Sequence, residues 1–189
     1  MKNTREKVLG IICARKGSKR LKNKNFLKIE DVSIFERAVR TLSESNIDHL
    51  VIAADLKPNF DPSTYDAVFI ERSVNISRDN VPLQETIMWI YYSLDREFEY
   101  LVFIMPNCPM IDSSSINKAI NLALSKNLNV VRSYNSVGME NGIIVVRTDY
   151  LKDHFIDVYC GSVIADGDEI HNEQDYIKTK QIIEGKNDI

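Results

Sequence analysis

The stretch VLGIICARKGSKRLKNKN, residues 8–25, joins an apolar run directly to a strongly basic one. Residues 8–14 are almost wholly apolar, which is typical of a β-strand buried on both faces of a parallel sheet. Residues 15–25 contain six lysines and arginines and no acid. Because open α/β sheets bind ligands beyond the carboxyl ends of their strands, a basic loop at this place is suited to holding an anion.

The positive charge of this loop is a local feature. The chain of 189 residues has 24 Lys+Arg against 27 Asp+Glu, a formal net charge of −3. Proteins that coat nucleic acid are usually strongly basic, so this balance argues against that class. The loop also lacks interleaved aromatic residues on which bases could stack. We therefore expect a small anionic ligand and no nucleic-acid partner.

Cysteine usage indicates a reducing compartment. The three cysteines, Cys13, Cys108 and Cys160, are far apart, and none forms a CxxC pair. Such an arrangement predicts neither a disulfide framework nor a metal site. The apolar run at 8–14 is too short for a membrane span and does not have the pattern of a signal peptide. We therefore expect a cytoplasmic protein that is not bound to a membrane.

The remaining apolar pattern alternates strand-like and helix-like segments. Further strands are expected at 49–55, 66–70, 100–105, 129–132 and 142–146. Helices are expected from 34, where Ser33 and Glu36 suggest a capping box, and at 81–94, 112–126 and 173–184. Alternating strands and helices predict a doubly wound α/β sandwich with a mostly parallel central sheet. Because no long Pro/Gly linker interrupts this pattern, we expect a single domain over residues 1–189.

The side chains of the basic loop have the chemistry of a phosphate site. Arg15 offers a planar fork to phosphate oxygens, whereas Lys19 and Lys24 act as point charges. Gly17 allows a positive φ and a close approach of the backbone to a ligand, and Ser18 adds a hydroxyl group to a possible anion nest. The loop matches neither GxxxxGK[ST] nor GxGxxG, so a Walker A motif and a dinucleotide fold are not indicated. The alternative is a solvated basic turn or a weak RNA contact.

The same stretch resembles the signature of the acylneuraminate cytidylyltransferases, the CMP-sialic acid synthetases. Members of that family have an apolar strand followed by A-R-x-G-S-K-x-L-x-x-K-N. The matching residues here are Ala14, Arg15, Gly17, Ser18, Lys19, Leu21, Lys24 and Asn25. In the family this loop holds the triphosphate of CTP, and the fold is a Rossmann-like nucleotidyltransferase three-layer sandwich. The resemblance therefore implies nucleotide contacts along the loop and catalytic roles for Arg15, Lys19 and Lys24.

Later landmarks of the family follow in the expected order. The stretch from Arg72 to Asp79 resembles R-P-x-x-L-x-x-D without its proline, which implies that Arg72 and the nearby residues Ser77 to Asp79 lie near the nucleotide. MPNCPM at 105–110 resembles Q-P-T-S-P-L and places Asn107 near the acceptor. The Asn141-Gly142 pair resembles the family's N-G, in which the asparagine reaches the sugar. The alternatives are a surface arginine at the first position and a plain turn at the last.

The metal-binding aspartates of the family are altered in this sequence. The family's D-x-D has become Glu169 and His171, and Asp55 and Asp168 are further candidate ligands. Mg²⁺ prefers hard oxygen ligands, which Glu169 and Asp55 can supply. Histidine is a softer ligand that also suits Mn²⁺ or Zn²⁺. We therefore expect Mg²⁺ or Mn²⁺ as the cofactor, with an exposed loop histidine as the alternative reading of His171.

The family's arm, which carries dimer contacts and holds the sugar carboxylate, is also reduced. In place of the arm the sequence has only the stretch 132–140, which runs from the end of the strand at 129–132 to Asn141. A homodimer, if one forms, is therefore not expected to use this arm. The resemblance implies transfer of CMP from CTP to a small acidic acceptor, a sialic-acid-like nonulosonate. The alternatives are a CTP-binding pseudoenzyme and a cytidylyltransferase for a smaller acid such as a phosphonate.

Overall fold

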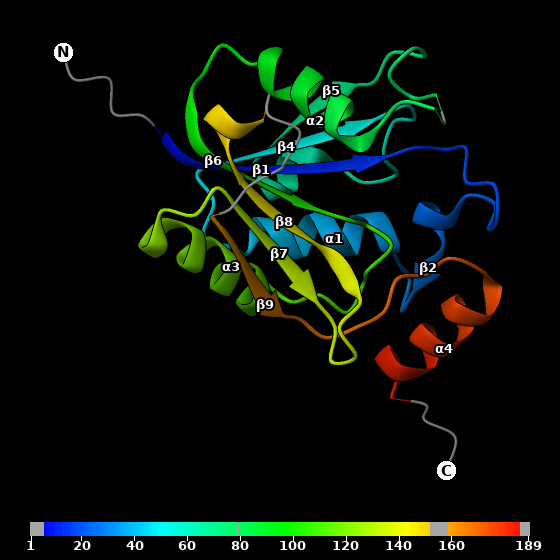
Figure 1. The fold of residues 1–189 in the computed structure, drawn as a ribbon. Coiled ribbons are helices and arrows are strands. Elements are labelled where there is room, and N and C mark those ends of the chain that lie inside the picture. The colour runs from blue at the N-terminus through cyan, green and yellow to red at the C-terminus, as the bar shows by residue number, and fades with distance from the viewer. Residues whose placement is uncertain (1–5, 79, 152–158, 186–189) are drawn as a thin grey trace.

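Seven strands form one sheet through the centre of the molecule (Figure 1). The computed structural model describes residues 6–78, 80–151 and 159–185. The strands are β1 (Glu6–Ala14), β4 (His49–Ala54), β5 (Ala67–Glu71), β6 (Phe98–Ile104), β7 (Val130–Tyr134), β8 (Glu140–Arg147) and β9 (Cys160–Ile164). Their order is β5-β4-β1-β6-β8-β7-β9. Because β8 alone in this sheet runs antiparallel to its neighbours, the predicted mostly parallel sheet is confirmed.

Ser33, Asp112 and Asn172 cap three of the four α-helices that the structure describes, whereas the helix after Pro82 has no side-chain cap. The α-helices are α1 (Ile34–Ser43), α2 (Leu83–Tyr92), α3 (Ser113–Lys126) and α4 (Glu173–Ile183), with short 3-10 helices η1 (Lys24–Phe26), η2 (Pro62–Tyr65) and η3 (Thr148–Tyr150). The Ser33 side chain accepts a hydrogen bond from the Glu36 N–H, as predicted, but the Glu36 carboxylate accepts from the Tyr65 hydroxyl and does not complete a capping box. None of the described helices has the length and apolar character needed to cross a membrane.

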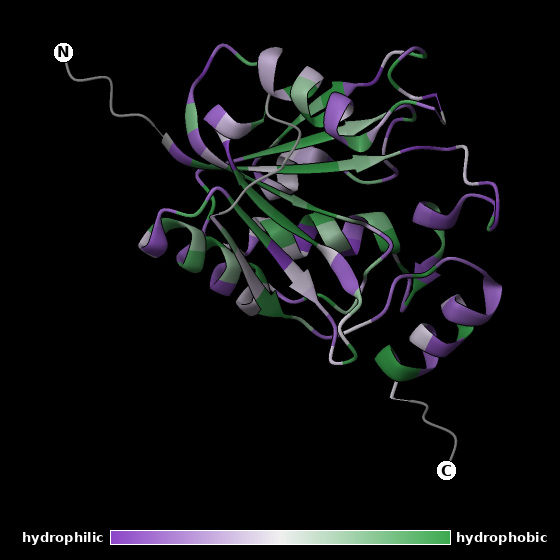
Figure 2. Cartoon of the chain, viewed as in Figure 1, coloured by the Kyte–Doolittle hydropathy of each residue, from purple (hydrophilic) through white to green (hydrophobic). Residues whose placement is uncertain are grey.

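The helices cover the two faces of the sheet and make three layers. Helices α1 and α3 pack on one face of β1, over Val8 and Ile12, and α2 packs on the other, over Leu9 and Ile11. Successive side chains of a strand point to opposite faces, so the apolar run of β1 fills both cores. Figure 2 shows the same division, with hydrophobic strands at the centre and hydrophilic loops outside. The predicted three-layer α/β sandwich is confirmed.

Two features were not predicted from the sequence. Strand β9 pairs with β7 at the edge of the sheet, and its side chains alternate between exposed and half-buried. The second feature is a small hairpin of β2 (Lys28–Ile29) and β3 (Val32–Ser33), against which α4 packs (Figure 1). Ile29, Ile34 and Ile170 form the buried centre of that contact. This packing brings the C-terminal part of the chain next to the basic loop.

The connections of β1 create a crevice at its carboxyl end. The chain passes from β1 to β4 by way of α1 on one face, and from β5 to β6 by way of α2 on the other. Strand β1 therefore has a parallel neighbour on each side, β4 and β6. The connection to β4 crosses one face of the sheet, and the connection to β6 crosses the other. A ligand-binding crevice is expected at such a switch point, outside the carboxyl ends of the strands. The basic loop leaves β1 at this place.

Glycine at position 142 is required by both backbone and packing. Gly142 has a φ of +61°, and a Cβ there would lie 2.6 Å from Ile111 Cδ1 and 2.8 Å from Cys108 Sγ. Gly138 has a φ of +84° with no heavy atom within 4 Å of such a Cβ. We expect Gly142→Ala to lower the free energy of unfolding by about 1–3 kcal/mol more than Gly138→Ala, because only the first must also overpack the core. Urea denaturation measures both, and equal losses would contradict the packing argument.

Candidate nucleotide-binding site

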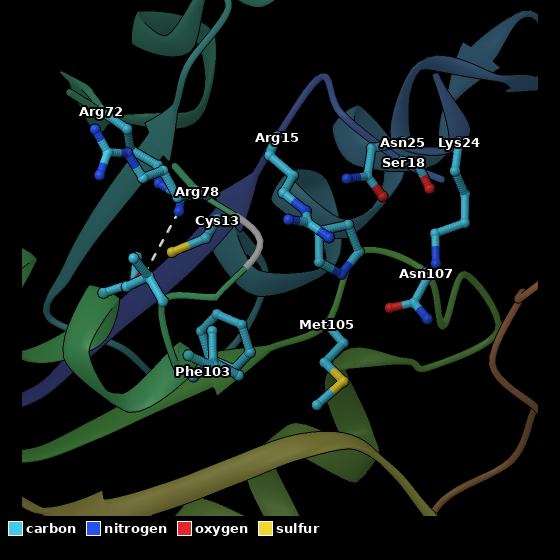
Figure 3. A pocket seen from close by; sticks show the side chains of 14 residues that line it. Cys13, Arg15, Ser18, Lys24, Asn25, Arg72, Arg78, Phe103, Met105 and Asn107 are labelled. Atoms are coloured by element: carbon cyan, nitrogen blue, oxygen red, sulfur yellow. Dashed lines mark hydrogen bonds between the residues drawn. The ribbon is translucent and has the colours of Figure 1, made fainter. Parts of the chain in front are cut away.

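A cavity of about 360 Å³ lies at the carboxyl ends of β1 and β6 (Figure 3). Its walls come from three segments: the end of β1 with the basic loop, the end of β6 with the loop that follows it, and residues 72–86, which lead into α2. The lining residues are Cys13, Arg15, Ser18, Lys24, Asn25, Arg72, Arg78, Val81, Leu83, Thr86, Phe103, Met105, Pro106 and Asn107. The crevice expected at the switch point is thus present, and it collects predicted residues from three separate parts of the sequence.

A second, smaller cavity of about 180 Å³ continues the first along the basic loop. It is lined by Arg15, Ser18, Lys19, Arg20, Lys24 and His171, and three of these residues also line the larger cavity. The two linings together contain six lysines and arginines, and no Asp or Glu among the residues that the structure describes. Clefts lined by one sign of charge concentrate ligands of the opposite sign. The shape and charge suit an elongated polyanion.

The basic loop is held at its start by the neighbouring strand. The N–H of Lys16 donates to Oδ1 of Asp55 at 2.8 Å, directly after β4. Asn25 is buried in η1. Gly17 is exposed, and its φ is not in the positive range that the sequence analysis allowed for. Gly17 and the buried Ala14 line neither cavity, so their predicted nucleotide contacts remain predictions.

Arg72 is buried at the cavity wall and is no ordinary surface arginine. Its side chain is 9% exposed. Its guanidinium donates to the carbonyls of Ile76 at 2.7 Å and Ala14 at 3.4 Å, and to the Thr86 hydroxyl at 3.5 Å. The Nε atom has no hydrogen-bond partner within the described ranges. Arg72 is therefore fixed by neutral groups and keeps its charge available to the cavity; Asp79, predicted alongside it, lies outside the described residues.

Lys24 and Asn107 meet at the other end of the cavity, where Figure 3 shows their side chains pointing toward one another. Lys24 Nζ donates to the Ile170 carbonyl at 2.8 Å. Asn107 Nδ2 donates to Glu169 Oε2 at 3.1 Å and more weakly to the same carbonyl at 3.5 Å. Burial lowers the pKa of Lys24, and the nearby Glu169 charge acts in the opposite direction. The segment before α4 thus closes this end of the cleft.

Asn141, the other predicted acceptor ligand, lies inside the protein. It is 1% exposed, and its Nδ2 donates to the carbonyls of Ala165 at 2.9 Å and Gly167 at 2.8 Å. It lines neither of the two cavities. In this structure its amide fastens the chain after β9 to β8, and an acceptor contact stays a prediction.

The candidate metal ligands are only partly brought together. His171 Nε2 lies 3.4 Å from Glu169 Oε2. Across the described ranges, no three His, Cys, Asp or Glu side chains form a group able to hold a metal ion, so neither Asp55 nor Asp168 completes one with this pair. Mg²⁺ is commonly held by one or two carboxylates together with substrate phosphates. Glu169, beside the basic cleft, fits that mode, in which phosphate oxygens supply the remaining ligands.

The apolar end of the larger cavity was not predicted from the sequence. Its walls include Val81, Leu83 and Phe103, with the buried Thr86 and the exposed Arg78 beside them. Phe103 reaches the cavity because β6 lies next to β1, and strand order is not readable from the chain. Arg78 is the exception, because it stands within the Ser77–Asp79 stretch that the resemblance placed near the nucleotide. This end offers the flat, apolar surroundings that suit a nucleobase.

Comparison with known proteins assigns the family. The sequence profile of the cytidylyltransferase family matches residues 9–166. This range contains most of β1, the basic loop and all of β6, so it covers most of the structure described above. The chain belongs to this cytidylyltransferase family.

Individual relatives are more distant. An uncharacterised protein of Methanocaldococcus jannaschii is 28% identical over 138 residues, which are 69% of this chain and 53% of that protein. The N-acylneuraminate cytidylyltransferase of Escherichia coli is 28% identical over 120 residues, 62% of this chain and 28% of that enzyme. The chain therefore spans about half, or less, of the length of these curated relatives.

The fold is also found among solved structures. The structure of CMP:2-keto-3-deoxy-manno-octonic acid synthetase complexed with CTP superposes with a TM-score of 0.76 at 12% identity. The match covers 96% of this chain and 100% of the other. At this identity the comparison concerns the fold alone, which is that of an α/β nucleotidyltransferase.

The cysteines supply a test of the cavity wall. Burial raises the pKa of Cys13 to about 12, despite the opposing charge of Arg72, whereas Cys160 is exposed. Because the thiolate is the reactive form, Cys13 should react with Ellman's reagent at pH 8 at least ~100-fold more slowly than Cys160. Mass spectrometry of the modified peptides measures both rates, and Cys160→Ser removes the fast reaction so that the Cys13 peptide can be followed beside the buried Cys108. Equally fast labelling of Cys13 would show that the wall is open.

Proposed function

We propose that this protein transfers CMP from CTP to a small acidic acceptor, a sugar acid of the nonulosonate type, with release of pyrophosphate. The observation that carries this proposal is the continuous cationic cleft at the end of β1 in a chain of the cytidylyltransferase family. The names of two similar proteins support the acceptor class, since one acts on N-acylneuraminate and the other on a keto-octonic acid.

The proposed nucleotide pose follows the chemistry of the cleft. The base lies at the apolar end, against Phe103 and Leu83, with Arg72 beside it. The triphosphate runs along the basic loop toward Lys19 in the smaller cavity. Arg15 lines both cavities and is therefore placed to contact phosphates at the junction. This direction puts the α-phosphate near the middle of the cleft.

The reaction needs positioning and charge neutralisation more than covalent chemistry. An acceptor oxygen attacks the α-phosphorus, its bond to phosphorus forms, and the bond from the α-phosphorus to the bridging oxygen of the β-phosphate breaks. The hydroxyl proton passes to water, and pyrophosphate leaves. Arg15, Lys19 and Lys24 offset the negative charge that grows on the leaving group.

A divalent ion, Mg²⁺ or Mn²⁺, would be held by Glu169 together with phosphate oxygens, with His171 as a neighbouring ligand. When bound, it would neutralise phosphate charge during the displacement. Asp55 is less suited to this role, because one of its oxygens already accepts the Lys16 N–H.

A smaller acid, such as a phosphonate, is the second candidate acceptor. Strands β7 and β8 are joined by residues 135–139 alone. At this place the acylneuraminate cytidylyltransferases, which the sequence resembles, carry an arm that holds the sugar carboxylate. The acceptor end of the cavity is instead bounded by Met105, Pro106 and Asn107. Because fewer protein groups reach the acceptor than in enzymes with the arm, a shorter acceptor molecule is favoured.

The nucleotide is tested first and the acceptor second. Calorimetry with CTP, UTP, ATP and GTP in the presence of Mg²⁺ is expected to give the tightest binding for CTP. Pyrophosphate release is then measured with N-acetylneuraminate, 2-keto-3-deoxy-octonate and 2-aminoethylphosphonate. Release with an acid supports transfer and names its class. CTP binding without release from any acid supports the pseudoenzyme, and no preference for CTP overturns the proposal.

Lys19 provides the sharpest variant of the phosphate cleft. We expect Lys19→Ala to weaken transition-state stabilisation by about 2–4 kcal/mol, because it removes one charged phosphate contact. Lys22→Ala is the matched control, since Lys22 is an exposed lysine of the same loop that lines neither cavity. Pyrophosphate release gives the rates, and circular dichroism checks the fold. Equal activity of the two variants would remove Lys19 from the mechanism.

A further inference from the structure

The segment of residues 169–171 reaches the cleft from beyond the part of the chain that matches the family profile, which ends at residue 166. It is anchored through its central residue. The Ile170 N–H donates to the backbone carbonyl of Asn107 at 2.8 Å, and the Ile170 side chain is fully buried between the β2–β3 hairpin and α4. The backbone on either side of Ile170 is therefore fixed, but the Glu169 side chain requires a contact of its own.

Asn107 supplies that contact. Its amide nitrogen donates to Glu169 Oε2 at 3.1 Å and to the Ile170 carbonyl at 3.5 Å. The same carbonyl accepts the hydrogen bond from Lys24 Nζ at 2.8 Å. Both contacts of Asn107 use the amide nitrogen, so the amide oxygen is the atom left to accept from another partner. Glu169 itself lines neither cavity, but its Oε2 atom contacts Asn107, which lines the larger cavity, and lies 3.4 Å from His171 Nε2, which belongs to the lining of the smaller one. The Glu169 side chain is 21% exposed, so its carboxylate is not sealed inside the protein.

We propose that Asn107 is a positioning residue, which holds the carboxylate of Glu169 at the phosphate cleft and acts on the nucleotide through that carboxylate. The inference rests on the proposed function, since it requires CTP and a divalent ion in this cleft. Partners that orient a metal-binding carboxylate typically change metal affinity by about 10–100-fold. Asn107 therefore determines how strongly the ion strengthens CTP binding, and it need not touch the acceptor.

A double-mutant cycle tests this role without knowledge of the acceptor. CTP affinity is measured by calorimetry with excess Mg²⁺ and with EDTA, for the unmodified protein, Asn107→Ala, Glu169→Ala and the double variant. With Mg²⁺, each single variant is expected to bind CTP about 10-fold or more weakly. The CTP affinity of the double variant should fall no further than that of Glu169→Ala alone, because both changes remove the same Asn107–Glu169 hydrogen bond. In EDTA, Asn107→Ala should bind CTP as the unmodified protein does.

Asp168→Ala is the matched control. It removes a carboxylate from the neighbouring position, whose partners are Asn135 at 2.8 Å and Lys178 at 3.5 Å, and neither partner lines the two cavities. We expect it to bind CTP normally in both conditions. Thermal melting in EDTA verifies that each variant is folded.

The outcomes separate the possible roles of Asn107. Unchanged CTP affinity of Asn107→Ala with Mg²⁺ overturns the inference and leaves an acceptor contact in its place. Equal losses with Mg²⁺ and with EDTA also overturn it, because they indicate a general distortion of the cleft, and so do additive losses in the double variant. If the unmodified protein binds no CTP in either condition, the proposed function itself fails.

Discussion

The burial of β1 between two parallel neighbours is the constraint on which the site depends. Its backbone hydrogen bonds are made to β4 and β6, and its side chains fill the cores on both faces. Charged residues cannot continue such a strand, so the chain must leave the core at Arg15. Because β6 runs parallel to β1 and ends beside it, the first charged residues emerge where the loop after β6 also begins.

The cleft gathers like charges that repel one another in the absence of a ligand. Its described lining holds six lysines and arginines without a carboxylate, although the whole chain has a formal net charge of −3. The fold tolerates this because neutral groups fix the cations, as the carbonyls around Arg72 do. A polyanion that binds the folded state therefore also stabilises it. Clustered positive charge lowers the stability of the protein without a ligand, so its presence here is consistent with a binding function.

The C-terminal part of the chain completes the cleft from a different direction. Helix α4 packs on the β2–β3 hairpin, which follows the basic loop directly, so one apolar contact aligns two segments far apart in sequence. Lys24 and Ile170, which share a hydrogen bond, are 146 residues apart. The position of the Glu169 carboxylate, which we propose binds the ion, thus depends on this small satellite core and not on the central sheet.

The sequence by itself determined six of the seven strands of the described central sheet, the α-helices and the basic loop after β1, because apolar periodicity and capping are local properties. It did not predict β9, since an edge strand with alternate exposed residues has few apolar positions. Only the tertiary structure decided that Phe103 and Thr86 line the cavity, that the Asn141 amide is used inside the protein, and that Asn107 faces Glu169. These facts follow from strand order and helix packing, which join residues distant in sequence and leave no periodic signal along the chain.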